Sequence, residues 1–232
     1  MQEVIYTIII AFSILCVFTF SEMMSRIWKI KVEITRKFVH ITSGLITLSF
    51  PMLIHDHFYV LILCTLFVLL LIISKKFDYL RSVHKVTRNT HGSYLFPLSV
   101  YICFLIYKYY DQQVFFFLPV FILSISDPIA AFSGIYWKKL QVRQNKLKVI
   151  GNQKTFAGTL MFFVSAFLAC VVMLSFQYKI TSTELVIISL SIGIISSYIE
   201  SVSHGGWDNL NIPLSVAAVL ILLKEYLLNF GS

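Results

Sequence analysis

Long apolar runs separated by short polar segments constrain this chain more than any other feature of its sequence. A bilayer core of ~30 Å is crossed by a helix of about 20 mostly apolar residues. Of the 232 residues, 58% are hydrophobic and 13% are charged, whereas soluble domains average about 25% charged residues. The sequence therefore predicts an all-α, polytopic integral membrane protein. We expect about eight transmembrane helices, over residues 4–20, 38–54, 58–74, 94–107, 114–136, 156–176, 185–199 and 212–228.

These apolar runs leave almost no sequence for a soluble domain. We find no long linker, low-complexity tract or internal repeat, so we expect one transmembrane domain over residues 1–232, with its catalytic motifs within 33–214. The first run lacks the small-residue cleavage site of a signal peptide. Each of the four cysteines lies inside an apolar run, which predicts small buried hydrophobic residues rather than disulfides or metal ligands.

The distribution of positive charge predicts the orientation in the membrane. The segments after the first, third and fifth apolar runs carry 16 of the 19 Lys and Arg residues, and such residues accumulate in cytoplasmic loops. We therefore expect both termini outside and the loops after runs one, three, five and seven in the cytoplasm. This bias, with contacts to anionic membrane lipids, also explains the net charge of +8, so we expect no nucleic-acid partner. The compact chain favours a bacterial inner (plasma) membrane over the endoplasmic reticulum.

An acidic residue interrupts the fifth apolar run. Asp127 followed by Pro128 is typical of a helix N-cap and first helical residue, so we expect the helix to break near Asp127 and restart at Pro128. A broken helix at membrane depth is tolerated only where it lines a cavity or is buried in protein. The restarted helix would direct its amides at phosphate, and the carboxylate could hold Mg²⁺. The alternative is a cap that simply ends a helix.

A basic cluster opens the second apolar run. His40 lies about one helical turn past Arg36 and Lys37, so all three can face one spot. That spot would suit an anionic or hydroxyl-bearing lipid head group. The alternative is a positively charged flank next to a buried histidine.

A longer basic loop, residues 137–154, ends where the chain re-enters the membrane. Lys154 is followed there by Thr155 and Gly158, and a lysine in this position suits neutralisation of a triphosphate. The surrounding residues do not form a P-loop. Lys138 and Lys139 could assist Lys154, although most charges of this loop are expected to be solvated or in contact with lipid phosphates.

The segment between the last two apolar runs, residues 200–213, combines acids, a histidine and paired glycines. Glycines let the backbone approach a ligand closely. Asp208 joins Asp127 as a second candidate metal ligand, and Glu200 is a third. An ordinary turn would explain the glycines and the asparagine, but it does not explain Glu200 at the end of an apolar run. The segment contributes Glu200, His204, Gly205, Gly206, Asp208 and Asn209 to the candidate site.

Taken in order, these motifs resemble the polyprenol kinase group, which includes dolichol kinase and phytol kinase and is related to the phosphatidate cytidylyltransferases. The resemblance extends from Glu33 to about Leu214. One motif alone is weak, but four in the family's order make a strong signal. The four motifs are Arg36-Lys37-x-x-His40, Asp127-Pro-Ile-Ala-Ala-x-x-Gly134, Lys154-Thr155-x-x-Gly158-Thr159, and Glu200 followed by Asp208-Asn209-Leu210-x-x-Pro213-Leu214.

Two features depart from the kinase pattern. Kinase relatives often have a further glycine where this chain has Trp137-Lys138-Lys139. In addition, His204-Gly205-Gly206 is similar to an element of the cytidylyltransferases, although those enzymes usually continue with Asp-Arg and this chain continues with Asp208-Asn209. We give more weight to the Asp-Asn-Leu-x-x-Pro-Leu motif and favour a kinase.

The resemblance implies phosphoryl transfer from a nucleoside triphosphate, with CTP the favoured donor, to the hydroxyl of an isoprenoid alcohol such as a polyprenol, dolichol or phytol. The acceptor would meet the nucleotide at the cytoplasmic membrane face. One alternative is a CTP-dependent cytidylyltransferase acting on phosphatidate. A second is a membrane transporter, since broken helices and intramembrane acids also mark transport pathways; the clustering of polar groups at one face disfavours transport.

The implied roles divide the candidate residues into three sets. The catalytic set is Asp127, Glu200 and Asp208, with Asp127 and Asp208 holding Mg²⁺ and either Glu200 or Asp208 accepting the hydroxyl proton. Arg36, Lys37 and His40 would orient the acceptor or the phosphates. The remaining substrate- or nucleotide-binding residues are Lys138, Lys139, Lys154, Thr155, Gly158, His204, Gly205, Gly206 and Asn209.

Overall fold

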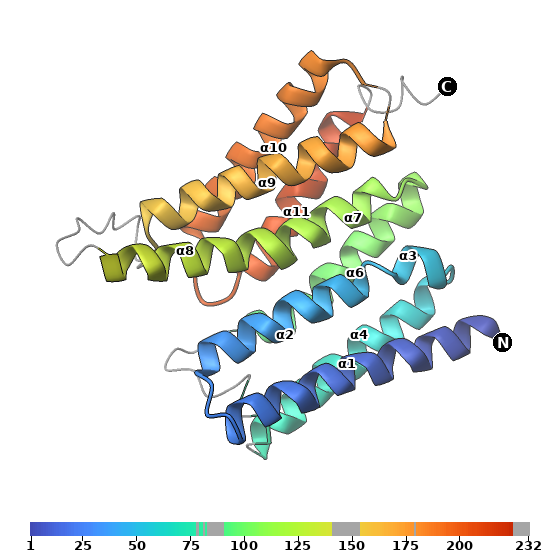
Figure 1. The fold of residues 1–232 in the computed structure, drawn as a ribbon. Coiled ribbons are helices and arrows are strands. Elements are labelled where there is room, and N and C mark those ends of the chain that lie inside the picture. Colours follow the sequence, from blue (N-terminus) through green and yellow to red (C-terminus); the bar gives the residue numbers. More distant parts are fainter. Residues whose placement is uncertain (78, 81, 83–90, 141–153, 179, 225–232) are drawn as a thin grey trace.

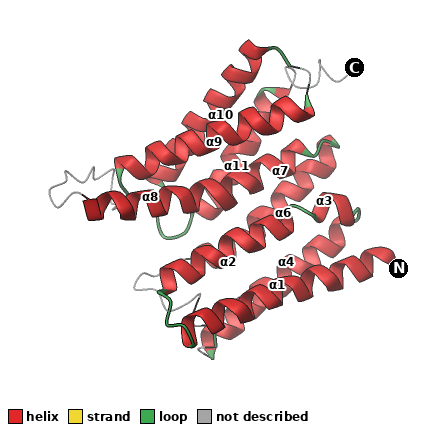
Figure 2. Cartoon of the chain, in the orientation of Figure 1, coloured by secondary structure: helices red, strands yellow, loops and turns green. Residues whose placement is uncertain are grey.

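The chain is helical throughout the part that the structure describes, a computed structural model covering residues 1–77, 79–80, 82, 91–140, 154–178 and 180–224. Figure 2 shows helices and connecting loops and no strand within those residues. The elements are α1 (Gln2–Arg26), α2 (Val32–Thr47), α3 (Phe50–Leu53), α4 (His57–Lys76), α6 (Gly92–Tyr110), α7 (Val114–Phe121), the π-helix η1 (Ile122–Ser126), α8 (Asp127–Leu140), α9 (Phe156–Gln177), α10 (Ser182–Val202) and α11 (Asp208–Leu222).

Several of these helices have the length and apolarity to cross a bilayer. Within the described residues, five do so: α1, α4, the continuous helix Val114–Trp137, α9 and α10, with α11 as a shorter apolar helix. The other expected spans coincide with α6 and with the pair α2 and α3, because the chain turns between Thr47 and Phe50. The protein is therefore an all-α, multi-pass membrane protein.

The helices alternate in direction, which gathers specific helix ends together (Figure 1). The C-terminal ends of α1, α4, α8 and α10 and the N-terminal ends of α2, α6, α9 and α11 lie at one end of the bundle, on the left of the view. The N-terminus, α3 and the turns joining α6 to α7 and α9 to α10 lie at the opposite end. This is the alternation that the positive charges predict; which end is cytoplasmic stays a prediction.

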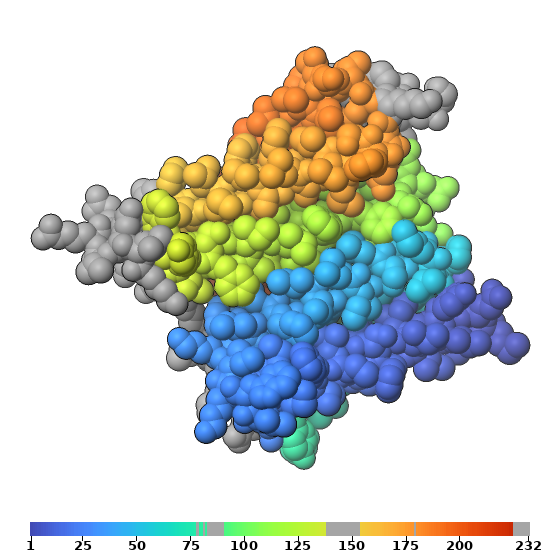
Figure 3. Space-filling model, in the orientation of Figure 1, coloured from blue at the N-terminus to red at the C-terminus, as the bar shows by residue number. Residues whose placement is uncertain are grey.

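Two apolar cores meet along α7. The first contains buried residues of α1, α2, α4 and α6, and the second contains buried residues of α8 to α11. Phe116 belongs to the first and Phe115 to the second, and both are almost fully buried. In Figure 3, α7 and α8 form a band between the N-terminal helices and the α9–α10 pair. The central helix therefore holds the two halves in register.

Glycines allow a close helix contact between α8 and α9. A Cβ atom on Gly158 would lie 2.9 Å from the carbonyl oxygen of Ala130, and one on Gly134 would lie 2.7 Å from Thr155 Oγ1. At both positions a larger residue would force a neighbouring atom to shift: the Thr155 side chain at Gly134 and the Ala130 backbone at Gly158. Small residues allow such close approach between membrane helices, so the Gly134 and Gly158 of the two motifs hold the segments carrying Asp127 and Lys154 together.

The predicted helix break near Asp127 is wrong. The helix runs from α7 through η1 into α8, and Asp127 has α-helical dihedral angles (φ −65°, ψ −45°). Pro128 lacks the N–H that would bond Leu123 O in the i→i−5 pattern of a π-turn. His40 Nε2 contacts that carbonyl oxygen at 3.1 Å. A side chain from α2 therefore compensates for the proline, and the helix does not need to break.

Candidate active site

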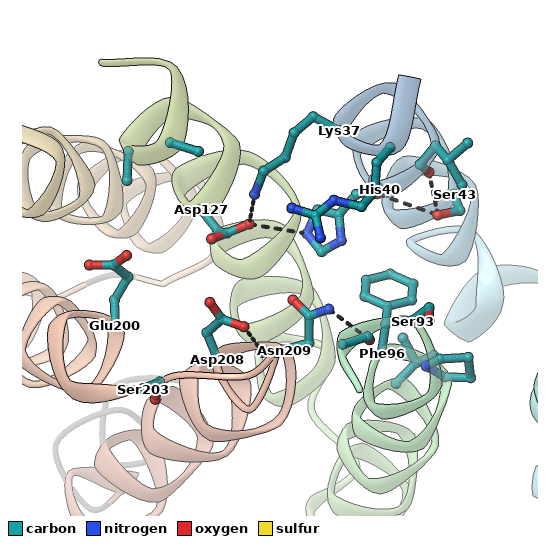
Figure 4. A pocket seen from close by; sticks show the side chains of 18 of the residues that line it. Lys37, His40, Ser43, Ser93, Phe96, Asp127, Glu200, Ser203, Asp208 and Asn209 are labelled. Carbon is teal, nitrogen blue, oxygen red and sulfur yellow. Dashed lines mark hydrogen bonds and ion pairs between the residues drawn. The ribbon is translucent and has the colours of Figure 1, made fainter. Parts of the chain in front are cut away.

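A cavity of about 540 Å³ lies where the two cores meet. Its polar end is formed by α2, α8, the start of α9, the end of α10 and the segment leading into α11 (Figure 4). Lys138 and Lys139 lie in α8, but their side chains fall outside the described part of the chain. The other residues that the sequence analysis selected all line the cavity: Arg36, Lys37, His40, Asp127, Lys154, Thr155, Gly158, Glu200, His204, Gly205, Gly206, Asp208 and Asn209.

An ion pair joins the second and fifth apolar runs at this polar end. Lys37 Nζ lies 2.5 Å from Asp127 Oδ2, and each side chain is only 10% exposed. His40 Nε2 lies 3.9 Å from the same carboxylate oxygen. Since a carbonyl oxygen only accepts hydrogen bonds, the contact of His40 Nε2 with Leu123 O assigns the proton to Nε2. The imidazole is thus held against α8, and its edge packs on the ring of Phe96.

Lys154 holds a second charged cluster together. Its ammonium lies 2.7 Å from Glu200 Oε1 and 3.4 Å from Asp208 Oδ2, and it also donates to the backbone carbonyl of Glu200. Burial disfavours the charged form, but the carboxylates of Asp208 and Glu200 outweigh burial and raise the pKa of Lys154 above its ordinary value. The side chain therefore remains a cation at neutral pH.

The position of Lys154 follows from the local sequence. Thr155 is the N-cap of α9, and its Oγ1 accepts a hydrogen bond from Gly158 N at 3.1 Å. A threonine cap satisfies an otherwise free amide at the helix start. The Lys-Thr-x-x-Gly motif thus places the N-cap directly after the lysine and the first helical residue, Phe156, two residues after it, which leaves Lys154 in non-helical backbone at the cavity edge.

The turn before α11 is tied to the start of α6. Gly205 and Gly206 have positive φ angles of 62° and 91°, which glycine adopts without strain. Gly205 O accepts from His91 N at 2.8 Å, and Asn209 Nδ2 donates to Gly92 O at 2.7 Å. Gly205, Gly206 and Asn209 therefore form a turn, as the alternative interpretation of this segment predicted, and this turn also places them in the cavity wall.

Two predicted residues lie at the cavity with other partners. Arg36 forms an ion pair with Glu33 at 3.0 Å, and its side chain is 30% exposed. His204 is exposed, and its Nδ1 lies 3.5 Å from Val202 O. Within the described residues, neither side chain forms an ion pair with Asp127 or Lys154, and both line the wall of the cavity.

The polar end can accommodate a divalent cation together with phosphate. No three His, Cys, Asp or Glu side chains of the described residues form a ready-made metal site. Mg²⁺, however, usually takes one or two carboxylates and completes its shell with phosphate oxygens and water. The described lining carries four carboxylates, including Asp127 and Asp208, but only three Lys or Arg side chains. Glu200 Oε2 is buried without a hydrogen-bond partner. This surplus of carboxylate oxygens fits a cation that arrives with an anionic ligand.

Sequence reasoning missed several residues of the cavity. Ser43, Ser93 and Phe96 line it, and Leu123 contributes its carbonyl oxygen to His40. Ser43, Phe96 and Leu123 lie inside apolar runs and Ser93 directly precedes one, so no charge pattern marks these small, apolar or backbone groups. Gly92 was detectable in principle, because an isolated glycine near a helix start often marks a close contact.

The fold and the cavity define a polytopic helical membrane protein in which a cluster of charged side chains adjoins apolar cavity walls. The chain is 27% identical over 199 residues, 86% of its length and 83% of the relative's, to phytol kinase from Synechocystis sp. (strain ATCC 27184 / PCC 6803 / Kazusa). The chain is thus a homologue of phytol kinase, and this similarity supports the resemblance to the polyprenol kinase group that the sequence motifs indicate. No family model and no solved structure matches it.

Proposed function

We propose that this protein phosphorylates the hydroxyl group of an isoprenoid alcohol at the cytoplasmic membrane face, with CTP as the phosphoryl donor. One observation carries the proposal: a single cavity combines the Lys37–Asp127 and Lys154–Glu200–Asp208 clusters with apolar walls. An isoprenoid alcohol has the same two parts, a polar hydroxyl and a hydrocarbon tail. The similarity to phytol kinase supports this class of acceptor.

In the proposed reaction, the alcohol oxygen attacks the γ-phosphorus of the nucleotide. The bond between that phosphorus and the β–γ bridging oxygen breaks, and the nucleoside diphosphate leaves. Such reactions depend mainly on positioning and charge stabilisation. Lys154 and Lys37 would stabilise negative charge on the phosphates, and Arg36 at the edge of the cavity would attract the incoming anion.

Asp127 and Asp208 are the residues that would hold Mg²⁺ in this reaction. A cation held by these two carboxylates would supply neutralisation of the charge on the transferring phosphoryl group. Both carboxylates line the cavity, and each lies beside a lysine ammonium. When the nucleotide binds, each lysine could form an ion pair with a phosphate instead of with its carboxylate.

We propose that Asp208 rather than Glu200 also accepts the hydroxyl proton, on the carboxylate oxygen that would not be bound to Mg²⁺. Glu200 Oε1 lies 2.7 Å from Lys154, and Glu200 Oε2 is buried with almost no accessible surface. The side chain of Asp208 is 20% exposed, against 7% for Glu200. The more accessible carboxylate is the better placed to meet an alcohol, which leaves Glu200 to position Lys154.

A labelling experiment tests the proposal. The purified protein is incubated in detergent with phytol, Mg²⁺ and CTP labelled at either the α or the γ phosphate. We expect label in the lipid from γ-labelled CTP alone, and a matching reaction with ATP measures the preference for the base. Transfer of the α label alone would refute a kinase.

The cytidylyltransferase alternative rests on a specific observation, because His204, Gly205 and Gly206 line the same cavity. Phosphatidate would replace the alcohol in the labelling experiment, and transfer of the α label would identify this activity. A transporter would need polar groups along a path across the membrane, whereas the charged lining residues gather at one end of the bundle. Turnover in detergent, without a membrane gradient, would argue against transport.

A further inference from the structure

The cavity continues from the charged clusters into an apolar region enclosed by α1, α2, α3, α4 and α6. Six residues define this region, which we term the apolar channel: Ile14, Thr47, Phe50, Leu63, Cys64 and Val100. Each is less than 9% exposed. These residues therefore face the interior of the protein, while other residues of the same helices, such as Phe12 and Leu66, are more than half exposed.

The length of the apolar channel can be estimated from its helices. Leu63 and Leu71 of α4 both line the cavity, as do Gly92 and Val100 of α6. Eight residues of helix advance about 12 Å. An extended carbon chain advances roughly 1.3 Å per bond of ~1.5 Å, so this depth accommodates roughly nine chain atoms, the backbone of about two isoprene units.

An apolar cavity of this kind is expected to bind an apolar ligand. Leaving such a space unfilled destabilises a fold, because the lining side chains lose packing partners, and dry cavities lined by aliphatic and aromatic side chains bind apolar ligands. This channel is also continuous with the charged clusters around Asp127 and Lys154. Its natural occupant is therefore an apolar chain whose polar end lies at those clusters.

We infer that the apolar channel holds the two isoprene units nearest the hydroxyl of the acceptor inside the protein. The inference rests on the proposed function and deepens it, because it states how the acceptor is selected. The first units of the tail leave the bilayer and contact α1, α2, α3, α4 and α6. The five-carbon alcohol prenol would fill only the upper half of the channel, next to the charged clusters. The ten-carbon alcohol geraniol and the twenty-carbon alcohol phytol would also fill the lower half, which contains Cys64 and Val100.

A matched pair of variants tests this selection. Cys64→Phe places a ring in the lower half of the channel, and Cys16→Phe makes the same change on the exposed side of α1. We expect Cys64→Phe to lower kcat/KM at least about tenfold for geraniol and phytol, since several methylene groups lose their burial, with prenol changed less than about twofold. Cys16→Phe should keep the wild-type profile. Equal profiles for the two variants would overturn the inference.

A second measurement uses the wild-type protein and does not depend on the folding of a variant. A geraniol analogue with a photoreactive diazirine at its terminal carbon is crosslinked in detergent, and the modified peptides are mapped by mass spectrometry. We expect labels at Thr47, Cys64 or Val100 that excess phytol removes. Labels confined to exposed positions such as Phe12 and Leu66 would overturn the inference, also where Cys64→Phe fails to fold.

The two hypotheses fail in different ways. If the wild-type protein transfers no γ-phosphate to any isoprenoid alcohol, the proposed function is wrong. If it phosphorylates phytol, but the Cys64→Phe profile matches that of Cys16→Phe and the crosslinks lie on the exterior, the kinase proposal stands and the apolar channel is not the tail site.

Discussion

Replacing Lys154 with methionine should separate the structural role of this lysine from its proposed chemical role. The ammonium lies 2.7 Å from Glu200 Oε1 and 3.4 Å from Asp208 Oδ2. At 2.7 Å and an effective dielectric constant of about 20, the attraction to Glu200 is roughly 6 kcal/mol before desolvation. Removing one partner of a buried pair costs about 3–5 kcal/mol. Because the lysine side chain is 23% exposed, we expect Lys154→Met to cost about 3 kcal/mol.

A double variant isolates the charge effect. In Lys154→Met/Glu200→Gln, no unpaired charge remains at position 200, so we expect about 2 kcal/mol of the lost stability to return. Thermal unfolding in detergent measures this, since about 3 kcal/mol corresponds to a fall of roughly 6–12 °C in Tm for a chain of this size. Phosphorylation of phytol should stay at least about 100-fold below wild type in both variants. Lys108→Met, on the opposite end of the bundle, is the control and should change neither property.

Two results would refute this reasoning. A Lys154→Met protein that unfolds at the wild-type temperature would show that the buried carboxylates do not need the lysine. A Lys154→Met protein with most of its activity would exclude the lysine from charge stabilisation. Because the carboxylates raise the pKa of Lys154 against the effect of burial, its contribution to stability is complete below the ordinary lysine pKa. That contribution should decline only as the pH rises through the elevated value.

Three further predictions concern Asp127, Gly158 and Pro128. Asp127→Asn should reduce phosphorylation at least about 100-fold with the fold retained by circular dichroism, and chelation of wild type should abolish activity until Mg²⁺ is restored; full activity of Asp127→Asn would exclude a metal role. Gly158→Ala should cost about 1–3 kcal/mol in thermal unfolding, because its Cβ would lie 2.9 Å from Ala130 O, and unchanged stability would contradict this contact. Pro128→Ala restores an N–H that can bond Leu123 O, so activity should fall without loss of stability; unchanged turnover would mean that His40 needs no such anchor.

The sequence predicts the helices well because the bilayer imposes one strong pattern. Within the described residues every expected apolar run overlaps a helix, and five of these helices have the length and apolarity of a membrane span; residues 225–228 of the eighth run lie outside the described part of the chain. The helices alternate in direction as the Lys and Arg distribution requires. The pairing of distant charges could not be predicted in the same way. Lys37 and Asp127 are 90 residues apart, and each motif alone offers several possible partners. Only the packing of α2 on η1 and α8 identifies them as a pair.

The prediction at Pro128 failed for a related reason. A proline inside an apolar run indicates a break when only local sequence is considered. The carbonyl group left without a donor was instead satisfied by His40, from a helix more than 80 residues earlier. The chemistry that makes proline disruptive therefore also determines how His40 is oriented, and neither effect can be derived from one segment.

The pairing of the charges also explains how such a site can exist at membrane depth before any ligand arrives. An isolated carboxylate or ammonium there is costly, and the Lys37–Asp127 and Lys154–Glu200–Asp208 clusters lower that cost by mutual neutralisation. A nucleotide that binds alone would take lysines from their carboxylates and leave buried acids unpaired. A nucleotide that binds with a divalent cation exchanges partners instead: the lysines contact phosphate while the carboxylates contact the cation. On this argument, the requirement for a metal follows from the charge balance of the resting site as well as from the chemistry of phosphoryl transfer.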